Sequence, residues 1–236
     1  MKKTILSILA ASTAVLGFNS ASAQDVSYSV GADYTTEYIF RGKELADAAI
    51  QPAIDVSVGD FYAGIWSSYA TNSDDTAQNE NDLYLGYNIA LSEIASLDLG
   101  YNMYYYPNGS AGIVDDMGQD HSSEVKIGAT FDVMLTPSLY LYYDWDLETL
   151  TVEGSIGYSL DLGAENTTLD LGAVLGTADV DDSQSMSGSY TYGQISATLN
   201  YAVSENGGFS AGVSYNGTDD TDSENIVGTV GVSASF

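Results

Sequence analysis

Apolar and polar positions alternate along most of this chain with a period of two residues. One of the clearest segments places an apolar side chain at every second position: Leu83, Leu85, Tyr87, Ile89 and Leu91. Side chains of a β-strand alternate between its two faces, so such a segment has one apolar face and one polar face. Segments of about ten residues with this alternation are typical of strands that cross a membrane.

The alternation predicts twelve strands in one domain. We expect them at residues 26–38, 49–58, 61–70, 82–91, 97–106, 123–134, 139–146, 150–160, 167–177, 190–203, 209–216 and 225–236. No helical period competes with this pattern, and no shift in composition divides the chain. The last segment ends on Phe236 and resembles the closing strand of bacterial outer-membrane barrels. Taken alone, it also fits the last strand of a soluble sandwich.

The connections between these strands differ in length and charge. Short connections are expected at residues 59–60, 92–96, 135–138, 162–166 and 204–208, and longer, carboxylate-rich ones at 72–81, 107–122, 178–189 and 217–224. The connection near residues 147–149 is a short exception. Short turns at one end and long loops at the other are typical of transmembrane barrels. We therefore expect an all-β, transmembrane up-and-down antiparallel β-barrel of twelve strands.

Aromatic residues on the apolar faces fall into two groups. Near the short turns lie Tyr28, Phe61, Phe131, Tyr158, Tyr201, Phe209 and Phe236, and near the long loops lie Tyr34, Tyr69, Tyr105, Tyr143, Trp145 and Tyr215. Amphipathic rings prefer the two interfaces of a bilayer, so two aromatic belts indicate a membrane barrel. A soluble sandwich has no reason to sort its aromatic residues in this way.

The first residues predict export from the cytoplasm. Lys2 and Lys3 precede an apolar run at residues 5–18, and Ala21-Ser22-Ala23 closes it. This order is that of a secretory signal peptide with its cleavage site. We assign residues 1–23 to the signal and residues 24–236 to the barrel, which we expect in the outer membrane of a Gram-negative bacterium. No later apolar run reaches the ~18 residues that a transmembrane helix requires.

The exported chain is strongly acidic. It keeps three basic residues, Arg41, Lys43 and Lys126, against 33 acidic ones, which gives a formal charge of −30. A chain with this charge lacks the basic surface needed to bind nucleic acid. It contains no cysteine, so no disulfide stabilises the domain.

The alternation assigns most strand carboxylates to the inside of the barrel. The inward-facing charged residues are Asp33, Glu37, Asp55, Asp82, Asp98, Glu124, Lys126, Asp132, Asp144, Asp146, Glu153 and Asp170. Charges on the lipid face would cost about 2–4 kcal/mol near the middle of the membrane. The interior is therefore either a plug of hydrogen-bonded side chains or a hydrated lumen. Unpaired carboxylates are costly in a dry core, so the charge favours a hydrated lumen in which inward glycines leave room.

Two motifs near the start of the barrel are more specific than the alternation. They read Tyr38-Ile39-Phe40-Arg41-Gly42 and Gly59-Asp60-Phe61-Tyr62-Ala63-Gly64-Ile65-Trp66-Ser67-Ser68. This part of the chain resembles the TorF-type porins, a proteobacterial family first catalogued as Gcw_chp conserved hypothetical proteins. The resemblance implies an outer-membrane barrel with a porin role. It brings no established substrate.

Arg41 and Trp66 join the inward acids as candidate pore-lining residues. Arg41 is either a cation at the constriction, facing an acidic wall, or one half of a structural pair with Glu37, Glu44 or Asp55 that fixes the first hairpin. Trp66 is separated from Tyr62 by an even number of positions, so both lie on the same face of the strand, and Trp66 is expected to face inward. It either stacks on Arg41 or fills volume.

The sequence offers little enzymatic or metal-binding chemistry. His121 is the only histidine and is expected in a loop, and without cysteine no zinc site can be assembled. The loop acids Asp179, Asp181, Asp182, Asp219, Asp220, Asp222 and Glu224 lack the spacing of a calcium-binding loop. We predict no enzyme, no catalytic residue, no metal site and no cofactor.

These features predict a narrow diffusion channel that prefers cations. Its expected partners are the lipid bilayer of the outer membrane and small hydrophilic solutes or cations, with no nucleic acid. The alternative is a non-conducting structural or surface-interaction barrel, whose acidic extracellular loops bind a partner or divalent cations. The oligomeric state, the substrate and the pore radius stay open.

Overall fold

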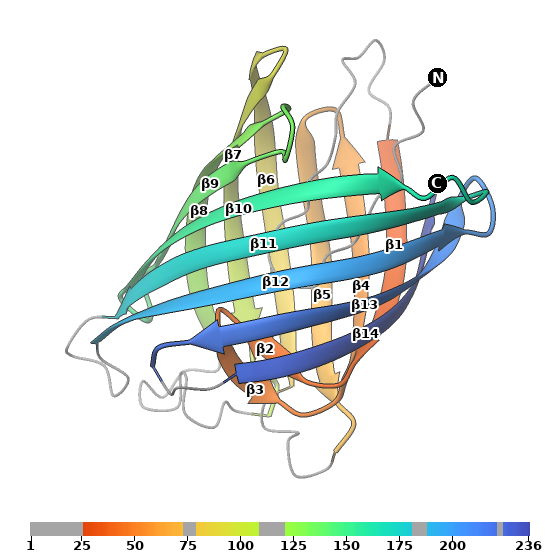
Figure 1. Ribbon diagram of the computed structural model, residues 1–236. Coiled ribbons are helices and arrows are strands. Elements are labelled where there is room, and N and C mark those ends of the chain that lie inside the picture. The colour runs from red at the N-terminus through yellow and green to blue at the C-terminus, as the bar shows by residue number, and fades with distance from the viewer. Residues whose placement is uncertain (1–25, 73–78, 109–120, 181–187, 221–223) are drawn as a thin grey trace.

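The computed structural model describes residues 26–72, 79–108, 121–180, 188–220 and 224–236. These residues form a closed barrel of twelve antiparallel strands and one small two-stranded sheet (Figure 1). The twelve-stranded barrel predicted from the alternation is confirmed. Within the described ranges, no helix has the length and apolarity needed to cross a membrane.

Each barrel strand pairs with its neighbours in the sequence once the small sheet is set aside. The barrel contains β1 (Val26–Thr35), β4 (Ala49–Val58), β5 (Phe61–Ala70), β6 (Glu80–Ser92), β7 (Ala95–Tyr105), β8 (His121–Phe131), β9 (Ser138–Asp144), β10 (Thr149–Asp161), β11 (Thr167–Val180), β12 (Gly188–Ala202), β13 (Gly207–Thr218) and β14 (Glu224–Ser235). The small sheet contains β2 (Tyr38–Phe40) and β3 (Lys43–Ala46).

The first and last strands close the barrel. β1 and β14 pair in register from Ser29 with Ser235 to Thr35 with Thr229. Beyond this ladder, the backbone amide of Tyr28 donates to the carbonyl of Phe236 at 3.0 Å. The amide of Phe236 donates in turn to the carbonyl of Tyr28 at 2.8 Å. The predicted terminal strand is thus the closing strand, and the barrel has no free sheet edge.

The outer surface of the barrel is apolar. Of the two predicted aromatic belts, every member except Tyr105 is an exposed side chain. Aliphatic side chains such as Ile54, Leu83 and Val230 are exposed in the same way. In water such a surface would aggregate, whereas the hydrocarbon core of a bilayer accepts it.

The predicted strand ends differ from the structure at several points. β1 ends at Thr35. The backbone of Thr36 still donates to Gly228 on β14, and the chain then forms β2 and β3. Asp132 and Asp146 were expected on strands. Asp132 instead follows the end of β8, and Asp146 lies in the turn between β9 and β10. His121 is the first residue of β8, where it pairs with Tyr105, and does not lie in a loop.

Candidate pore constriction

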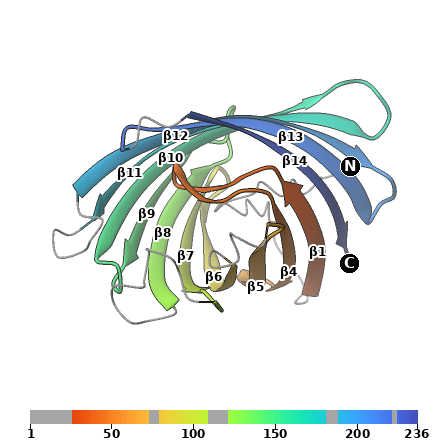
Figure 2. The same cartoon turned by 90° about the horizontal axis from the view of Figure 1, so that it is seen from below.

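The sheet of β2 and β3 is a hairpin with the two-residue turn Arg41-Gly42. Phe40 pairs with Lys43, and both turn residues have positive φ, 47° for Arg41 and 76° for Gly42. Two positive φ values define the type I′ turn that suits a tight hairpin. A Cβ added at Gly42 would lie 2.6 Å from the Cβ of Tyr192 on β12, so only glycine fits here. Seen along the barrel, the hairpin crosses its opening (Figure 2).

The base of the hairpin is anchored through Tyr38. Its hydroxyl donates to Glu80 on β6 at 2.8 Å, and its ring packs against Trp66 on β5 with centroids 5.4 Å apart. Burial, with the nearby Glu80 carboxylate, raises the pKa of Tyr38 well above its usual value. The hydroxyl therefore keeps its proton and remains a donor. Tyr106 donates to the same carboxylate at 3.2 Å.

The tip of the hairpin is anchored through Arg41. Its guanidinium donates to both carboxylate oxygens of Glu124 on β8, at 2.6 and 3.1 Å. The two side chains are only 8% and 2% exposed. The guanidinium also lies over the rings of Phe40 and Tyr142, 4.8 and 4.4 Å from their centroids. Arginine suits this position because its planar fork binds a carboxylate through two hydrogen bonds and stacks on aromatic rings.

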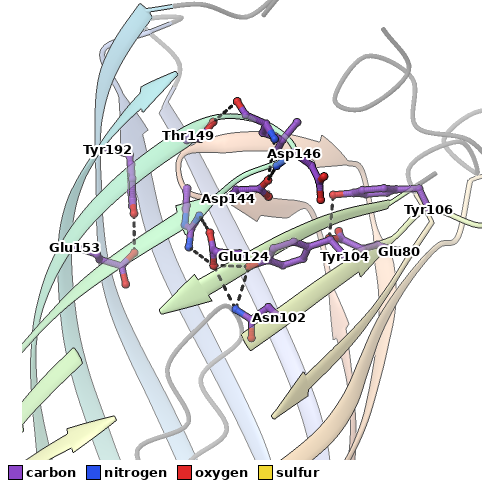
Figure 3. Close-up of polar contacts among 12 residues, drawn as sticks. Glu80, Asn102, Tyr104, Tyr106, Glu124, Asp144, Asp146, Thr149, Glu153 and Tyr192 are labelled. Carbon is purple, nitrogen blue, oxygen red and sulfur yellow. Dashed lines mark hydrogen bonds and ion pairs between the residues drawn. The ribbon is translucent and has the colours of Figure 1, made fainter. Parts of the chain in front are cut away.

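Glu124 accepts further hydrogen bonds from β7. The Tyr104 hydroxyl donates at 2.9 Å and the Asn102 amide at 3.3 Å, as Figure 3 shows. These donors complete the environment of a carboxylate that would otherwise be buried with one partner. These contacts therefore join the hairpin to β7 and β8, two strands that are distant from the hairpin in the sequence.

The predicted partners of Arg41 were wrong. Arg41 pairs with Glu124, whereas Glu37 and Glu44 both accept hydrogen bonds from the amide of Asn225 on β14, at 2.8 and 3.4 Å. Of the two roles considered for Trp66, the structure shows packing, against Tyr38, and no stacking on Arg41.

All three basic residues that follow the predicted signal peptide are paired with acids. Besides Arg41, Lys43 pairs with Asp220 and lies 4.2 Å from the centroid of the Tyr190 ring. Lys126 lies 3.4 Å from Asp98. None of the three is therefore left as an uncompensated positive charge inside the barrel.

Tyrosines and carboxylates satisfy one another over the inner face of β4–β10, which we call the packed wall. The Tyr62 hydroxyl donates to Asp98 at 2.8 Å, and the Tyr84 hydroxyl donates to Asp55. From β12, Tyr192 donates to Glu153 at 2.7 Å (Figure 3). These three acids are thus hydrogen-bonded, as buried polar groups generally are, whereas Oδ1 of Asp82 has no hydrogen-bond partner among the described residues.

Glycines let the tyrosine rings lie flat against the packed wall. Gly64 pairs with Tyr84, Gly86 with Tyr62, and Gly128 with Tyr140 on the neighbouring strands. A Cβ added at these glycines would lie 2.2 to 2.4 Å from the facing ring. The inward glycines of this wall were expected to leave room, and this was wrong because the facing rings fill that room.

The other side of the interior is open. We call the inner face of β12, β13, β14 and β1 the open wall. A cavity of about 70 Å³ separates it from the hairpin, where Tyr38 and Ile39 form the opposite side. The open wall contributes mainly small polar side chains: Ser196, Thr198, Ser210, Ser214, Asn216 and Thr229.

The predicted inward residues divide between these regions. Asp33, Glu37 and Trp66 line the cavity. Asp55, Asp82, Asp98, Glu124, Lys126 and Glu153 lie on the packed wall. Asp144 accepts from the backbone of Asp146 and Leu147 and so shapes the β9–β10 turn (Figure 3), and Asp170 accepts from Asn200.

Sequence reasoning missed the inward tyrosines and the docked hairpin. The signal for both was present, because Tyr38, Phe40, Arg41 and Gly42 are the named positions of the first motif, and Tyr62, Gly64 and Trp66 belong to the second. Each of these residues makes an inner contact. The specificity of the motifs therefore reflects packing inside the barrel.

The fold is similar to that of several outer-membrane channels of known structure. The KdgM porin superposes with a TM-score of 0.58 at 14% identity, covering 89% of this chain and 99% of that one. The NanC porin gives 0.57 at 13% identity, covering 88% and 98%. An outer membrane channel from Pseudomonas putida F1 gives 0.53 at 9% identity, covering 92% and 97%. These identities establish a shared fold only.

At the level of sequence, no curated protein matches the chain. A family model described as "Bacterial protein of unknown function (Gcw_chp)" matches residues 18–234, which is nearly the whole chain. The chain therefore belongs to the Gcw_chp family.

Proposed function

We propose that this chain is a porin-like diffusion channel in the outer membrane of a Gram-negative bacterium, exported through the signal peptide at residues 1–23. The observation that carries the proposal is the cavity between the docked hairpin and the open wall, inside a closed barrel with an apolar outer surface. The channels of similar fold support it, as does the resemblance to TorF-type porins.

The hairpin is the constriction of this channel. It is held at its base by Tyr38 and at its tip by Arg41, so it occupies a fixed place in the lumen. Solutes pass on the side that it leaves free, along the open wall. A constriction anchored by buried hydrogen bonds keeps a constant width, which suits a narrow diffusion channel.

The channel prefers cations. Asp33 and Glu37 line the cavity, and no lysine or arginine does so among the described residues. Carboxylates lining a pore raise the local concentration of cations and lower that of anions. The basic residues cannot reverse this preference, because each is paired with an acid.

The second candidate is a non-conducting structural or surface-interaction barrel. The packed wall favours it, because tyrosine rings and the docked hairpin already fill one side of the interior. In that case the acidic loops would carry the function. Most of those loops, at residues 73–78, 109–120, 181–187 and 221–223, lie outside the described residues.

Conductance of the purified, folded protein in a planar bilayer separates the two candidates. The channel predicts discrete current steps in KCl and a reversal potential of cation-selective sign across a salt gradient. Folded protein that inserts without current steps would contradict the channel and support the structural barrel. Heat-modifiable migration on a gel verifies folding in either case.

A further inference from the structure

The open wall carries a regular array of small polar side chains. Around the barrel, Thr198 pairs with Gly212, Gly212 with Thr229, and Thr229 with Thr35. The next row continues from Ser210 through Gly231 to Asp33. Adjacent strands are about 4.8 Å apart, and alternate residues of one strand are about 7 Å apart. One hexose ring can therefore reach hydroxyls on two neighbouring strands.

The hydroxyls of this array are available to a solute. Within the described residues, those of Ser196, Thr198, Ser210 and Thr229 have no hydrogen-bond partner, although all four line the cavity. A serine or threonine hydroxyl both donates and accepts, as a sugar hydroxyl does. The tyrosine hydroxyls of the packed wall differ, since those of Tyr62 and Tyr104 donate to carboxylates of the barrel itself.

The charges beside the array are negative. The Asp33 carboxylate lies so close to Gly231 that a Cβ there would be in contact with its Oδ1. It therefore occupies space in the lumen that glycine leaves free. Glu37 lines the same cavity from the hairpin side. A solute passing between them meets hydroxyls on one side and carboxylates at the edges.

From this arrangement we propose that the channel admits neutral polyhydroxylated solutes of sugar size and discriminates against their carboxylated counterparts. This inference rests on the proposed channel function and adds the solute class. Neutral sugars exchange hydrogen bonds with water for hydrogen bonds with the array. A uronate meets the same hydroxyls but is repelled by Asp33 and Glu37, and no basic side chain among the described residues lines the cavity to compensate.

A matched pair of solutes tests the proposal. Galactose and potassium galacturonate share a ring and differ at one carboxylate. We would measure swelling of proteoliposomes at low ionic strength, with valinomycin present so that potassium movement does not limit uronate entry. We expect galactose to enter at least about fivefold faster, since a potential of one to two kT suffices for this ratio. Equal rates would overturn the inferred solute class. Absence of swelling with every solute would instead contradict the channel itself.

Substitutions on the open wall test whether its side chains determine which solutes enter. Asp33→Asn should raise the galacturonate rate toward that of galactose. Thr198→Tyr should reduce galactose entry severalfold by filling the array, whereas Ala197→Leu, on the outer face of the same strand, should change it little. If Thr198→Tyr assembles normally and leaves galactose entry unchanged, the proposed route along the open wall is wrong.

Discussion

The packed wall and the open wall have the same backbone fold and opposite inner chemistry. On the packed wall, large tyrosine rings and carboxylates pair across neighbouring strands, and side chains such as Tyr142, Glu80 and Glu124 are fully buried. On the open wall, the inward positions beside the cavity carry mainly serine, threonine and glycine. A polar lumen can therefore be a core or a passage. The difference depends on whether its polar groups already satisfy one another.

The hairpin extends the packed wall across the barrel. Tyr38 donates to Glu80, and Arg41 joins the network of Glu124, so the hairpin adds donors to carboxylates that need them. On the side of β13 and β14, the hairpin is held by more exposed contacts, the pair of Lys43 with Asp220 and the hydrogen bond from Asn225 to Glu44. The anchoring of the hairpin is therefore asymmetric, and the cavity lies on its more exposed side.

Removing the hairpin should have the largest effect on this asymmetry. Replacing residues 38–46 with a short Gly-Ser linker should increase single-channel conductance severalfold, because the constriction is lost while the twelve barrel strands remain. Conductance in 1 M KCl measures this directly. Unchanged conductance in a folded variant would show that the hairpin does not limit the pore.

Breaking the tip anchor should destabilise the barrel strongly. Arg41→Ala leaves Glu124 buried without its cation, and loss of one partner of a buried pair costs about 3–5 kcal/mol. Lys43→Ala is the matched control, since its pair with Asp220 is partly exposed, at 21% and 40%, and such pairs contribute about 0–1 kcal/mol. Urea unfolding in lipid vesicles gives both free energies. Equal losses would mean that the Arg41 pair is no more important than a surface contact.

A single methyl group should distinguish the two walls. Gly128→Ala places a Cβ 2.2 Å from the Tyr140 ring, which is itself stacked on Tyr142, so overpacking should cost about 1–3 kcal/mol. Gly212→Ala on the open wall meets the rotatable hydroxyl of Thr198 at 2.8 Å and should stay within about 0.5 kcal/mol. The midpoints of urea unfolding test this. Similar midpoints would contradict the close packing of tyrosine on glycine.

The alternation predicted the barrel well for a physical reason. Lipid on one side and a polar interior on the other impose a period of two on every spanning strand, and the bounds predicted for β4 and β5 match the structure. The hairpin was missed because strands of three and four residues are too short to show this period. Its strongest partner, Glu124, is 83 positions away in sequence.

The candidate site was predictable only in part. The alternation of the two strand faces places a carboxylate inside the barrel, but it does not predict whether a tyrosine or lysine side chain will contact that carboxylate. The alternation predicts that Asp33 and Asp98 both face inward. Asp98 has Tyr62 and Lys126 as partners, whereas Asp33 lies beside the cavity. Partner choice depends on neighbouring strands, which one sequence does not reveal.

Asp33 therefore gives the most selective test of the comparison, although its effect should be the smallest. Asp33→Asn removes one charge at the cavity and should lower the proposed preference for potassium over chloride in 0.1 M KCl, where the Debye length is about 10 Å. Asp60→Asn removes the same charge in the exposed β4–β5 turn and should change the preference less. Both differences should shrink near 1 M KCl, where screening shortens this length to about 3 Å. Reversal potentials of the two variants at both salt concentrations measure this. A larger shift for Asp60→Asn would place the selective charges at the rim, and the open wall would then not determine which ions pass.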